Sequence, residues 1–188
     1  MTATAEALRF DRQALELIRA DVASITDAEM TLPTPCEGWN VAGLIAHMNR
    51  EHTAICGAPA GASPVGTDSR AEFAPITERW LAFFSTAGDT VRIPRLAAEL
   101  PTQTVLATHA VDMLIHRWDL ARARGRTPRT PAGLLPRAHA VADLVTAPGS
   151  PLTGPEGVYK PPIPAAAGSD SFDALVSKYG RDPNWRQR

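Results

Sequence analysis

The stretch "HAVDMLIHRWDLA", residues 109–121, combines an almost entirely apolar helix with a single polar stripe. An α-helix turns by about 100° per residue, so His109, Asp112, His116 and Asp119 lie within one quarter-turn of its surface. Apolar side chains occupy nearly every other direction, and a helix that is apolar nearly all round is a buried helix. The polar stripe is therefore predicted to face a cavity or the interior of a helical bundle.

Hydrophobic residues recur at helical spacings along most of the chain. Four main helices are expected at about residues 5–29, 40–55, 71–87 and 101–125, and two shorter ones at about 131–146 and 171–179. The segment 89–100 is ambiguous and could be partly extended, and 147–169 reads as irregular chain. We therefore predict an all-α fold, a four-helix bundle with extra short helices and an irregular C-terminal segment.

Composition limits the classes of protein that fit. The 188 residues suit one domain, spanning 1–188, and lysine plus arginine (19) balance aspartate plus glutamate (20), which argues against a nucleic-acid partner. No apolar run approaches membrane-spanning length, and the N-terminus has no apolar signal core. We expect a cytoplasmic protein with no membrane partner, in which Cys36 and Cys56 are free thiols that pack as small hydrophobes.

The polar stripe contains a candidate metal site. Asp112 and His116 lie one helical turn apart, the spacing by which one helix supplies two ligands. A third ligand should come from a facing helix, and the best candidate is His47 in "GLIAHMNREH", which neighbours apolar positions and can point inward. Two imidazoles and one carboxylate suit Zn²⁺, but also Ni²⁺, Mn²⁺ or Fe²⁺.

Simpler interpretations remain open for each residue. An Asp/His pair one turn apart is more often a hydrogen-bonded pair than a metal site. Asp119 could orient a ligand histidine through its second ring nitrogen, or bond to backbone near the helix end. Trp118 lies opposite the stripe and is predicted to be core, whereas His52 and His139 are expected at the surface.

Three segments carry a resemblance to a known family. "TPCEGWNVAGLIAHM" (34–48) and "HAVDMLIHRWDLARARG" (109–125) resemble the helix-two and helix-four signatures of the maleylpyruvate isomerase-like branch of the DinB superfamily. "FDALVSKYGRDPNW" (172–185) resembles the C-terminal tail of a small actinobacterial single-domain subfamily described as metal-binding. The three segments follow one another in order over nearly the whole chain.

The resemblance implies a DinB-like four-helix bundle that holds a divalent metal through three side chains. The family histidine of helix two matches His47, and the helix-four ligand pair matches Asp112 and His116. The characterised mycothiol-dependent isomerase has glutamate at the position of Asp112. Aspartate is one methylene shorter, so whether Asp112 touches the metal directly stays open.

The function implied by the resemblance is metal-assisted chemistry on a small thiol. The family isomerase has a further C-terminal domain that contributes to its active site, so we expect a different reaction here: thiol transfer or isomerisation with mycothiol or a similar thiol as cosubstrate. His109 is the candidate general base, and Arg50, Arg92 or Arg95 could anchor a substrate carboxylate, although each is more often solvated surface charge. A homodimer would fit the superfamily.

Two alternatives remain from other classes of protein. One is a metal-binding bundle without catalysis that acts in stress or sensing. The other is a structural bundle whose polar stripe is only a hydrogen-bonded network. Metal content separates the structural bundle from the two metal-binding candidates. Conversion of a thiol cosubstrate then separates the enzyme from the metal-binding bundle without catalysis.

Overall fold

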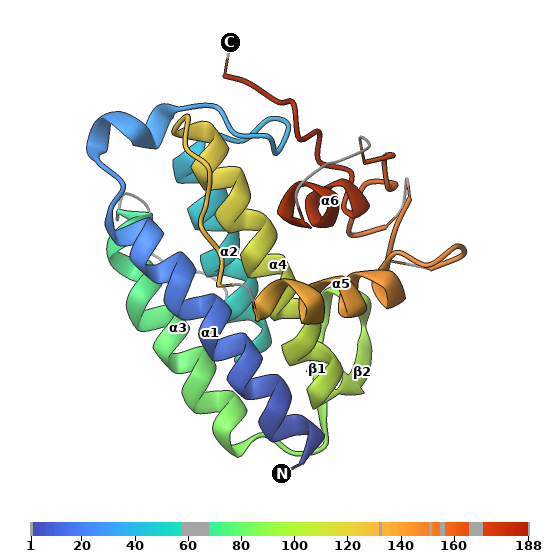
Figure 1. Cartoon of the computed structure of the whole chain (residues 1–188). Coiled ribbons are helices and arrows are strands. Elements are labelled where there is room, and N and C mark those ends of the chain that lie inside the picture. The colour runs from blue at the N-terminus through green and yellow to red at the C-terminus, as the bar shows by residue number, and fades with distance from the viewer. Residues whose placement is uncertain are drawn as a thin grey trace.

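Helix α4 (Thr102–Ala123), which contains the polar stripe, runs through the middle of the molecule in the computed structural model (Figure 1). Every residue from 113 to 120 is buried, as the nearly continuous apolar surface of this helix predicts. The described residues are 2–57, 68–131, 133–150, 152–154, 157–165 and 171–187. Trp118 is 1% exposed, which confirms its assignment to the core.

Three further long helices complete a bundle around α4. They are α1 (Ala3–Ala23), α2 (Val41–Ile55) and α3 (Ser69–Thr86). Helix α1 packs along α4 and α3, and α2 packs against α3 and α4 (Figure 1). Their buried hydrophobic side chains form one cluster with those of α4. The predicted all-α, four-helix arrangement is confirmed.

Smaller elements lie on the other side of α4. Helices α5 (Leu134–Val145) and α6 (Ser171–Lys178) pack on each other and on α4 (Figure 1). The ambiguous segment forms an antiparallel hairpin of β1 (Thr90–Ile93) and β2 (Ala98–Pro101), with the short 3-10 helix η2 (Pro94–Leu96) at its tip. The two strands pair in the register Thr90–Pro101 to Ile93–Ala98 and form a sheet of two strands.

Capping residues set the helix boundaries. The Asn40 side chain accepts a hydrogen bond from the Gly43 backbone N–H at 2.8 Å, so the predicted start of α2 is confirmed. The predicted first helix is wrong at its C-terminal end, because α1 stops at Ala23 and the chain begins again as the 3-10 helix η1 (Asp27–Thr31). Thr26 and Glu29 form a capping box there.

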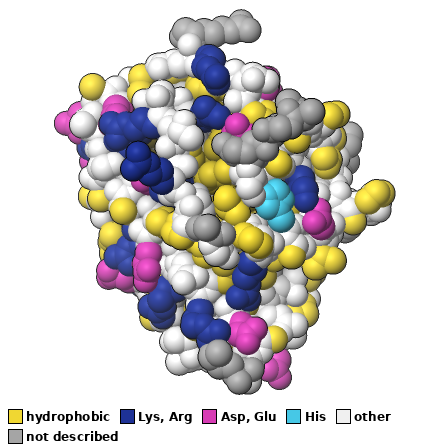
Figure 2. All heavy atoms as spheres, in the orientation of Figure 1, with side chains coloured by type: hydrophobic (Ala, Val, Ile, Leu, Met, Phe, Trp, Pro, Cys, Tyr) yellow, Lys and Arg dark blue, Asp and Glu magenta, His cyan; other side chains and the backbone are white. Residues whose placement is uncertain are grey.

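The surface of the molecule carries mixed charge, and one histidine expected there is buried. Basic and acidic side chains are interspersed on the face shown in Figure 2. The prediction that His52 lies at the surface is wrong, because its side chain is buried against α3 and α4. Among the residues described, no helix is both long and apolar enough to cross a bilayer. Most of the loop predicted between the second and third helices, 58–67, lies outside the described residues.

Candidate functional site

One large cavity, of about 920 Å³, opens beside α4 and collects most of the predicted site residues. Side chains of α2, α4, the β1–β2 hairpin and the chain after α6 line it. Its aromatic lining consists of Trp39, Trp80, Tyr159 and Trp185. A smaller cavity of about 360 Å³ lies between α1, α4 and α5 and is lined by none of the predicted ligands. The larger cavity is therefore the candidate site.

The three predicted metal ligands, His47, Asp112 and His116, all line this cavity. Asp112 Oδ2 lies 3.4 Å from His116 Nε2 on α4, and the rings of His47 and His116 meet edge to face with centroids 5.8 Å apart. Two imidazoles and one carboxylate thus face the same cavity from α2 and α4. Of the three arginines considered as substrate anchors, Arg95 lines the cavity.

The protonation states of these groups follow from their surroundings. Burial and the neighbouring His116 lower the pKa of His47 to about 4, so its imidazole is neutral at pH 7. Burial opposes the charged form of Asp112, but the His116 imidazole outweighs it and holds the pKa of Asp112 below its usual range. Burial likewise opposes the charged form of His116, but the carboxylates of Asp112 and Asp119 hold its pKa well above the usual value.

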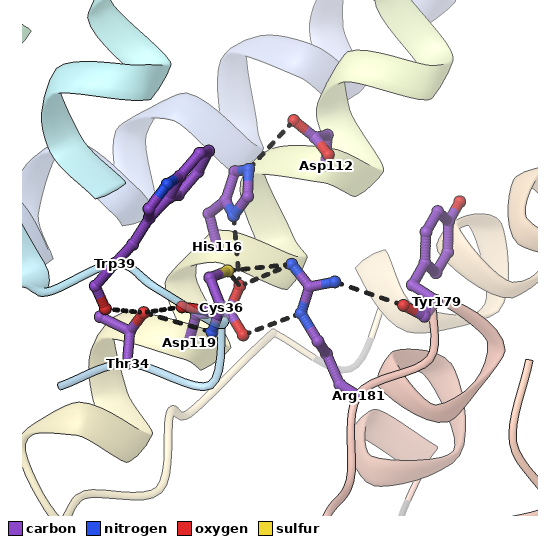
Figure 3. A network of polar contacts seen from close by, with 8 residues as sticks. All are labelled: Thr34, Cys36, Trp39, Asp112, His116, Asp119, Tyr179 and Arg181. Carbon is purple, nitrogen blue, oxygen red and sulfur yellow. Dashed lines mark hydrogen bonds and ion pairs between the residues drawn. The ribbon is translucent and has the colours of Figure 1, made fainter. Parts of the chain in front are cut away.

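The Nδ1 side of the His116 ring contacts the buried carboxylate of Asp119 (Figure 3). His116 Nδ1 donates to Asp119 Oδ2 at 3.2 Å, so the contact predicted for Asp119 is present. The Cys36 thiol donates to the same oxygen at 3.1 Å. Arg181 reaches the pair from the chain after α6 and donates to both Asp119 oxygens, each at 3.1 Å. With Nδ1–H held in this way, His116 presents Nε2 to Asp112.

A tight turn between η1 and α2 places Cys36 against His116. The Thr34 hydroxyl donates to the Trp39 carbonyl at 2.9 Å and accepts from the Cys36 backbone N–H at 3.2 Å (Figure 3). Gly38 has a φ of 79°, a backbone conformation that residues other than glycine rarely adopt. Cys36 is thus a half-buried wall residue of the cavity, and burial followed by the Asp119 carboxylate raises the pKa of its thiol.

His109 belongs to a separate buried chain of hydrogen bonds. The Met48 carbonyl can only accept, so His52 Nδ1 donates to it at 2.6 Å. Burial and His109 lower the pKa of His52 to about 3, so its Nε2 is a free acceptor and His109 Nε2 donates to it at 2.9 Å. The other nitrogen, His109 Nδ1, lies 2.5 Å from Asp11 Oδ1, and Trp80 Nε1 donates to Asp11 Oδ2 at 2.8 Å. Both ring nitrogens of His109 are therefore occupied by protein groups.

Cys36, Tyr159 and Arg181 line the cavity but were not singled out as site residues from the sequence. Cys36 and Arg181 fall inside segments that carry the family resemblance, 34–48 and 172–185, so a signal for them was present. Burial and the nearby Asp112 carboxylate raise the pKa of Tyr159 well above its usual value, so this phenol stays protonated. It lies in the irregular segment, where no periodicity marks it.

Known proteins resemble this chain in both sequence and fold. Residues 12–72 match the family model of the mycothiol maleylpyruvate isomerase N-terminal domain, which confirms the predicted resemblance for that segment. The segment contains His47 but not α4. The uncharacterized proteins MT0763 (strain CDC 1551 / Oshkosh) and Rv0738 (strain ATCC 25618 / H37Rv) of Mycobacterium tuberculosis are each 25% identical over 177 residues, covering 90% of this chain and 94% of theirs.

The fold also matches two solved structures. The mycothiol-dependent maleylpyruvate isomerase superposes with a TM-score of 0.57 at 18% identity, and a histidine-to-alanine mutant of it with a TM-score of 0.58 at 17% identity. Each alignment covers 76% of this chain and 69% of the other. At this level of identity the match establishes that the two chains share a helical fold, which agrees with the DinB-like bundle predicted from the sequence.

Proposed function

We propose that this protein is a metal-dependent enzyme that uses mycothiol or a related small thiol in a transfer or isomerisation reaction. The observation that carries the proposal is that His47 from α2 lines the same large cavity as Asp112 and His116 from α4, with its ring beside that of His116. The match of residues 12–72 to a family named for a mycothiol-dependent isomerase supports the choice of thiol.

The donor set suits a divalent transition metal, with Zn²⁺ the first choice. Ligands must be deprotonated at the atom that binds, and the lowered pKa values of His47 and Asp112 meet this requirement at pH 7. His116 would give up its Nε2 proton on binding, while Asp119 keeps the Nδ1 proton in place. Three protein ligands leave room for one from the substrate.

The chain's own residues would bind and orient the two reactants. A divalent cation held by His47, Asp112 and His116 would supply the acidity that makes a bound thiol nucleophilic near neutral pH. The aromatic and aliphatic wall of the cavity would hold the apolar part of a substrate and displace water from it. Arg95 and Lys160, which also line the cavity, can pair with a carboxylate on either reactant.

The role of His109 stays a prediction, and its contacts favour support over proton transfer. A general base needs an unshared lone pair within hydrogen-bond reach of the substrate. His109 has its ring nitrogens bonded to Asp11 and His52, so it would have to break one of these bonds first. We therefore assign it to holding α4 in place beside the cavity.

The test combines metal content with thiol chemistry. Protein purified without a histidine tag is expected to carry stoichiometric metal, and His47→Ala and His116→Ala are expected to lose it. His139→Ala is the matched control, because His139 contacts Ser171 at the surface of α5. Mycothiol is then incubated with a panel of electrophiles and unsaturated acids, and consumption of thiol or substrate is followed with wild type and with His116→Ala.

The outcomes separate the candidate functions. Metal in the wild type with metal-dependent conversion supports the enzyme. Metal without any conversion across the panel favours a metal-binding bundle that does not catalyse. Metal-free protein leaves the stripe as a hydrogen-bonded network, and metal that persists in both histidine variants contradicts the proposed ligand set.

A further inference from the structure

The guanidinium of Arg181 lies in a position where a bound cation would also be stabilised. It donates from Nε to Asp119 Oδ1 and from Nη2 to Asp119 Oδ2, each at 3.1 Å, and Nη2 also lies 3.1 Å from Cys36 Sγ (Figure 3). The Asp119 carboxylate is fully buried and the Arg181 side chain is 13% exposed. A buried carboxylate needs a compensating positive charge, and Arg181 contributes it together with His116.

The groups around this guanidinium form a second set of potential metal ligands. Cys36, His116 and Asp119 each offer one ligand atom, and these atoms lie within 4.8 Å of one another. Sulfur, imidazole nitrogen and carboxylate oxygen are a donor set that zinc and cobalt accept. The two sets share His116, which faces Asp112 through Nε2 and Asp119 through Nδ1.

We propose that Arg181 determines which side of His116 can bind a metal. Asp119 Oδ2 accepts hydrogen bonds from the Cys36 thiol, from His116 Nδ1 and from Arg181 Nη2, so the oxygen nearest the other two ligand residues has no lone pair left for a cation. The guanidinium also repels any cation that approaches Cys36 and Asp119. Metal binding is thereby confined to Nε2, on the side of His47 and Asp112.

Removal of the guanidinium would leave the buried Asp119 carboxylate to share the His116 imidazole with Asp112 as its counter-charge. Asp119 keeps its place in the core, and a divalent cation bound by Cys36, His116 and Asp119 becomes the nearest replacement for the lost positive charge. Binding there would release the thiol proton of Cys36 and the Nδ1 proton of His116. The guanidinium thus keeps a latent metal site closed, and Arg181 is a positioning residue that acts on His116 through Asp119.

Cobalt absorption tests this directly, because a thiolate ligand adds a sulfur-to-cobalt charge-transfer band in the near ultraviolet. Wild-type apoprotein titrated with Co²⁺ is expected to lack that band. Arg181→Leu and Arg181→Gln are expected to gain it, and the double variant Arg181→Gln, Cys36→Ser is expected to lose it again. Arg181→Gln is included because its amide keeps a hydrogen-bond donor beside Asp119, which favours folding.

Two controls isolate the charge at this position. Arg181→Lys keeps a cation near Asp119 and is expected to resemble the wild type. Lys160→Leu removes a cation from the same cavity, but Lys160 pairs with Glu37 rather than with Asp119, so no band is expected. Circular dichroism confirms that each variant is folded before titration.

The Nε2 part of the inference rests on the proposed function, whereas the latent site stands on the contacts around Asp119. A charge-transfer band in the wild type, or its absence from folded Arg181→Gln, overturns the inference even if the wild type binds cobalt through His47. A wild type that binds no cobalt, beside an Arg181→Gln variant with the thiolate band, overturns the proposed function and supports the latent site.

Discussion

Asp112 is the residue on which the proposed metal site depends most. Its carboxylate contacts His116 Nε2 at 3.4 Å and is ionised at neutral pH, so it has the charge and the position of a ligand. The side chain is 26% exposed and lines the cavity, so a cation bound in the cavity can reach it. A glutamate would reach one methylene further from the same backbone position.

The substitution Asp112→Asn keeps the shape of the side chain and removes its charge. Affinity for Zn²⁺ is expected to fall by at least about tenfold, the scale found when groups around a metal site are changed. Competition with a chelating dye measures it. Asp112→Glu should retain binding within a few-fold, and unchanged affinity in Asp112→Asn would show that this carboxylate is not a ligand.

Whether a site residue could be predicted from the sequence depends on how far away along the chain its partner lies. Asp112 and His116 are predictable because helical periodicity alone places them together, and His47 because its apolar neighbours direct it inward. Cys36 and Arg181 are separated by 145 positions, and their contact depends on how two irregular segments pack. His52 was misplaced because its partner is distant in the sequence: in the fold it faces His109, 57 positions away on α4.

The four long helices are joined by a chain of hydrogen bonds through Asp11, His52, Trp80 and His109. It takes one residue from each of α1, α2, α3 and α4. Hydrogen bonds are directional, so a shift of any helix along its axis breaks at least one of them. The chain therefore fixes the relative positions of the four helices, which apolar packing alone specifies less strictly.

Asp11→Asn removes the carboxylate that pairs with His109 and is expected to destabilise the protein by about 3 kcal/mol, because it leaves a buried partner without its counter-group. Trp80→Phe removes only the N–H donor to Asp11 and is expected to cost about 1 kcal/mol. Urea unfolding followed by circular dichroism measures both. If Asp11→Asn costs no more than Trp80→Phe, the hydrogen bonds through Asp11 contribute little to the stability of the protein.

The capping box of η1 also ties this short helix to the end of α4. Hydrogen bonds from Arg124 and from the Thr26 backbone lower the pKa of Glu29 from about 4.5 to about 2. Arg124 Nε donates to Glu29 Oε1 at 3.0 Å, and the Glu29 side chain is 18% exposed. Since the folded-state pKa is depressed, the stabilisation is complete above pH 4.5 and is lost as the pH falls toward 2.

Glu29→Gln is therefore expected to lower the free energy of unfolding by about 1 kcal/mol at pH 7. The difference from wild type should shrink between pH 4.5 and pH 2, as the wild-type carboxylate becomes protonated. Thermal unfolding across this pH range provides the measurement. Glu37→Gln, which changes an exposed carboxylate, should show little effect at any pH, and a Glu29→Gln difference that does not vary with pH would contradict the assignment.

Sequence patterns placed the long helices well and the connections poorly. Periodicity and the Asn40 cap located α2, and Gly88 and Gly125 bounded the helices before them. The β1–β2 hairpin does alternate in burial, with Val91, Ile93, Ala98 and Leu100 less exposed than their neighbours, but four residues a strand are too few to identify a strand from the sequence alone. Such short elements take their form from tertiary packing rather than from propensity.

At the scale of the whole molecule, the segment after α6 closes one side of the cavity. Arg181, Asp182 and Trp185 line it, and Arg181 joins this segment to the turn that contains Cys36. The polar part of the site is therefore enclosed by segments far apart in the sequence, which meet around the central α4. Access of small molecules to Cys36 depends on how this segment is packed.

A chain truncated after Gly180 is expected to keep its helical circular dichroism while its Cys36 thiol becomes more reactive, because the segment covering it is gone. Reaction with a chromogenic disulfide, measured in a Cys56→Ser background, should be several-fold faster than in the full chain. Trp185→Ala in the full chain provides an intermediate case. Equal rates in the full and truncated chains would show that the segment does not shield this side of the cavity.

The contact between Cys36 and Arg181 also has a kinetic consequence. Closing a loop of 145 residues carries a large entropic penalty, and pairings this far apart form only after local helices have assembled. The contacts of Arg181 with Cys36 and Asp119 should therefore be among the last to form during refolding. Pulse labelling of Cys36 would find it open after the helices have gained their circular dichroism, and protected only in the final phase.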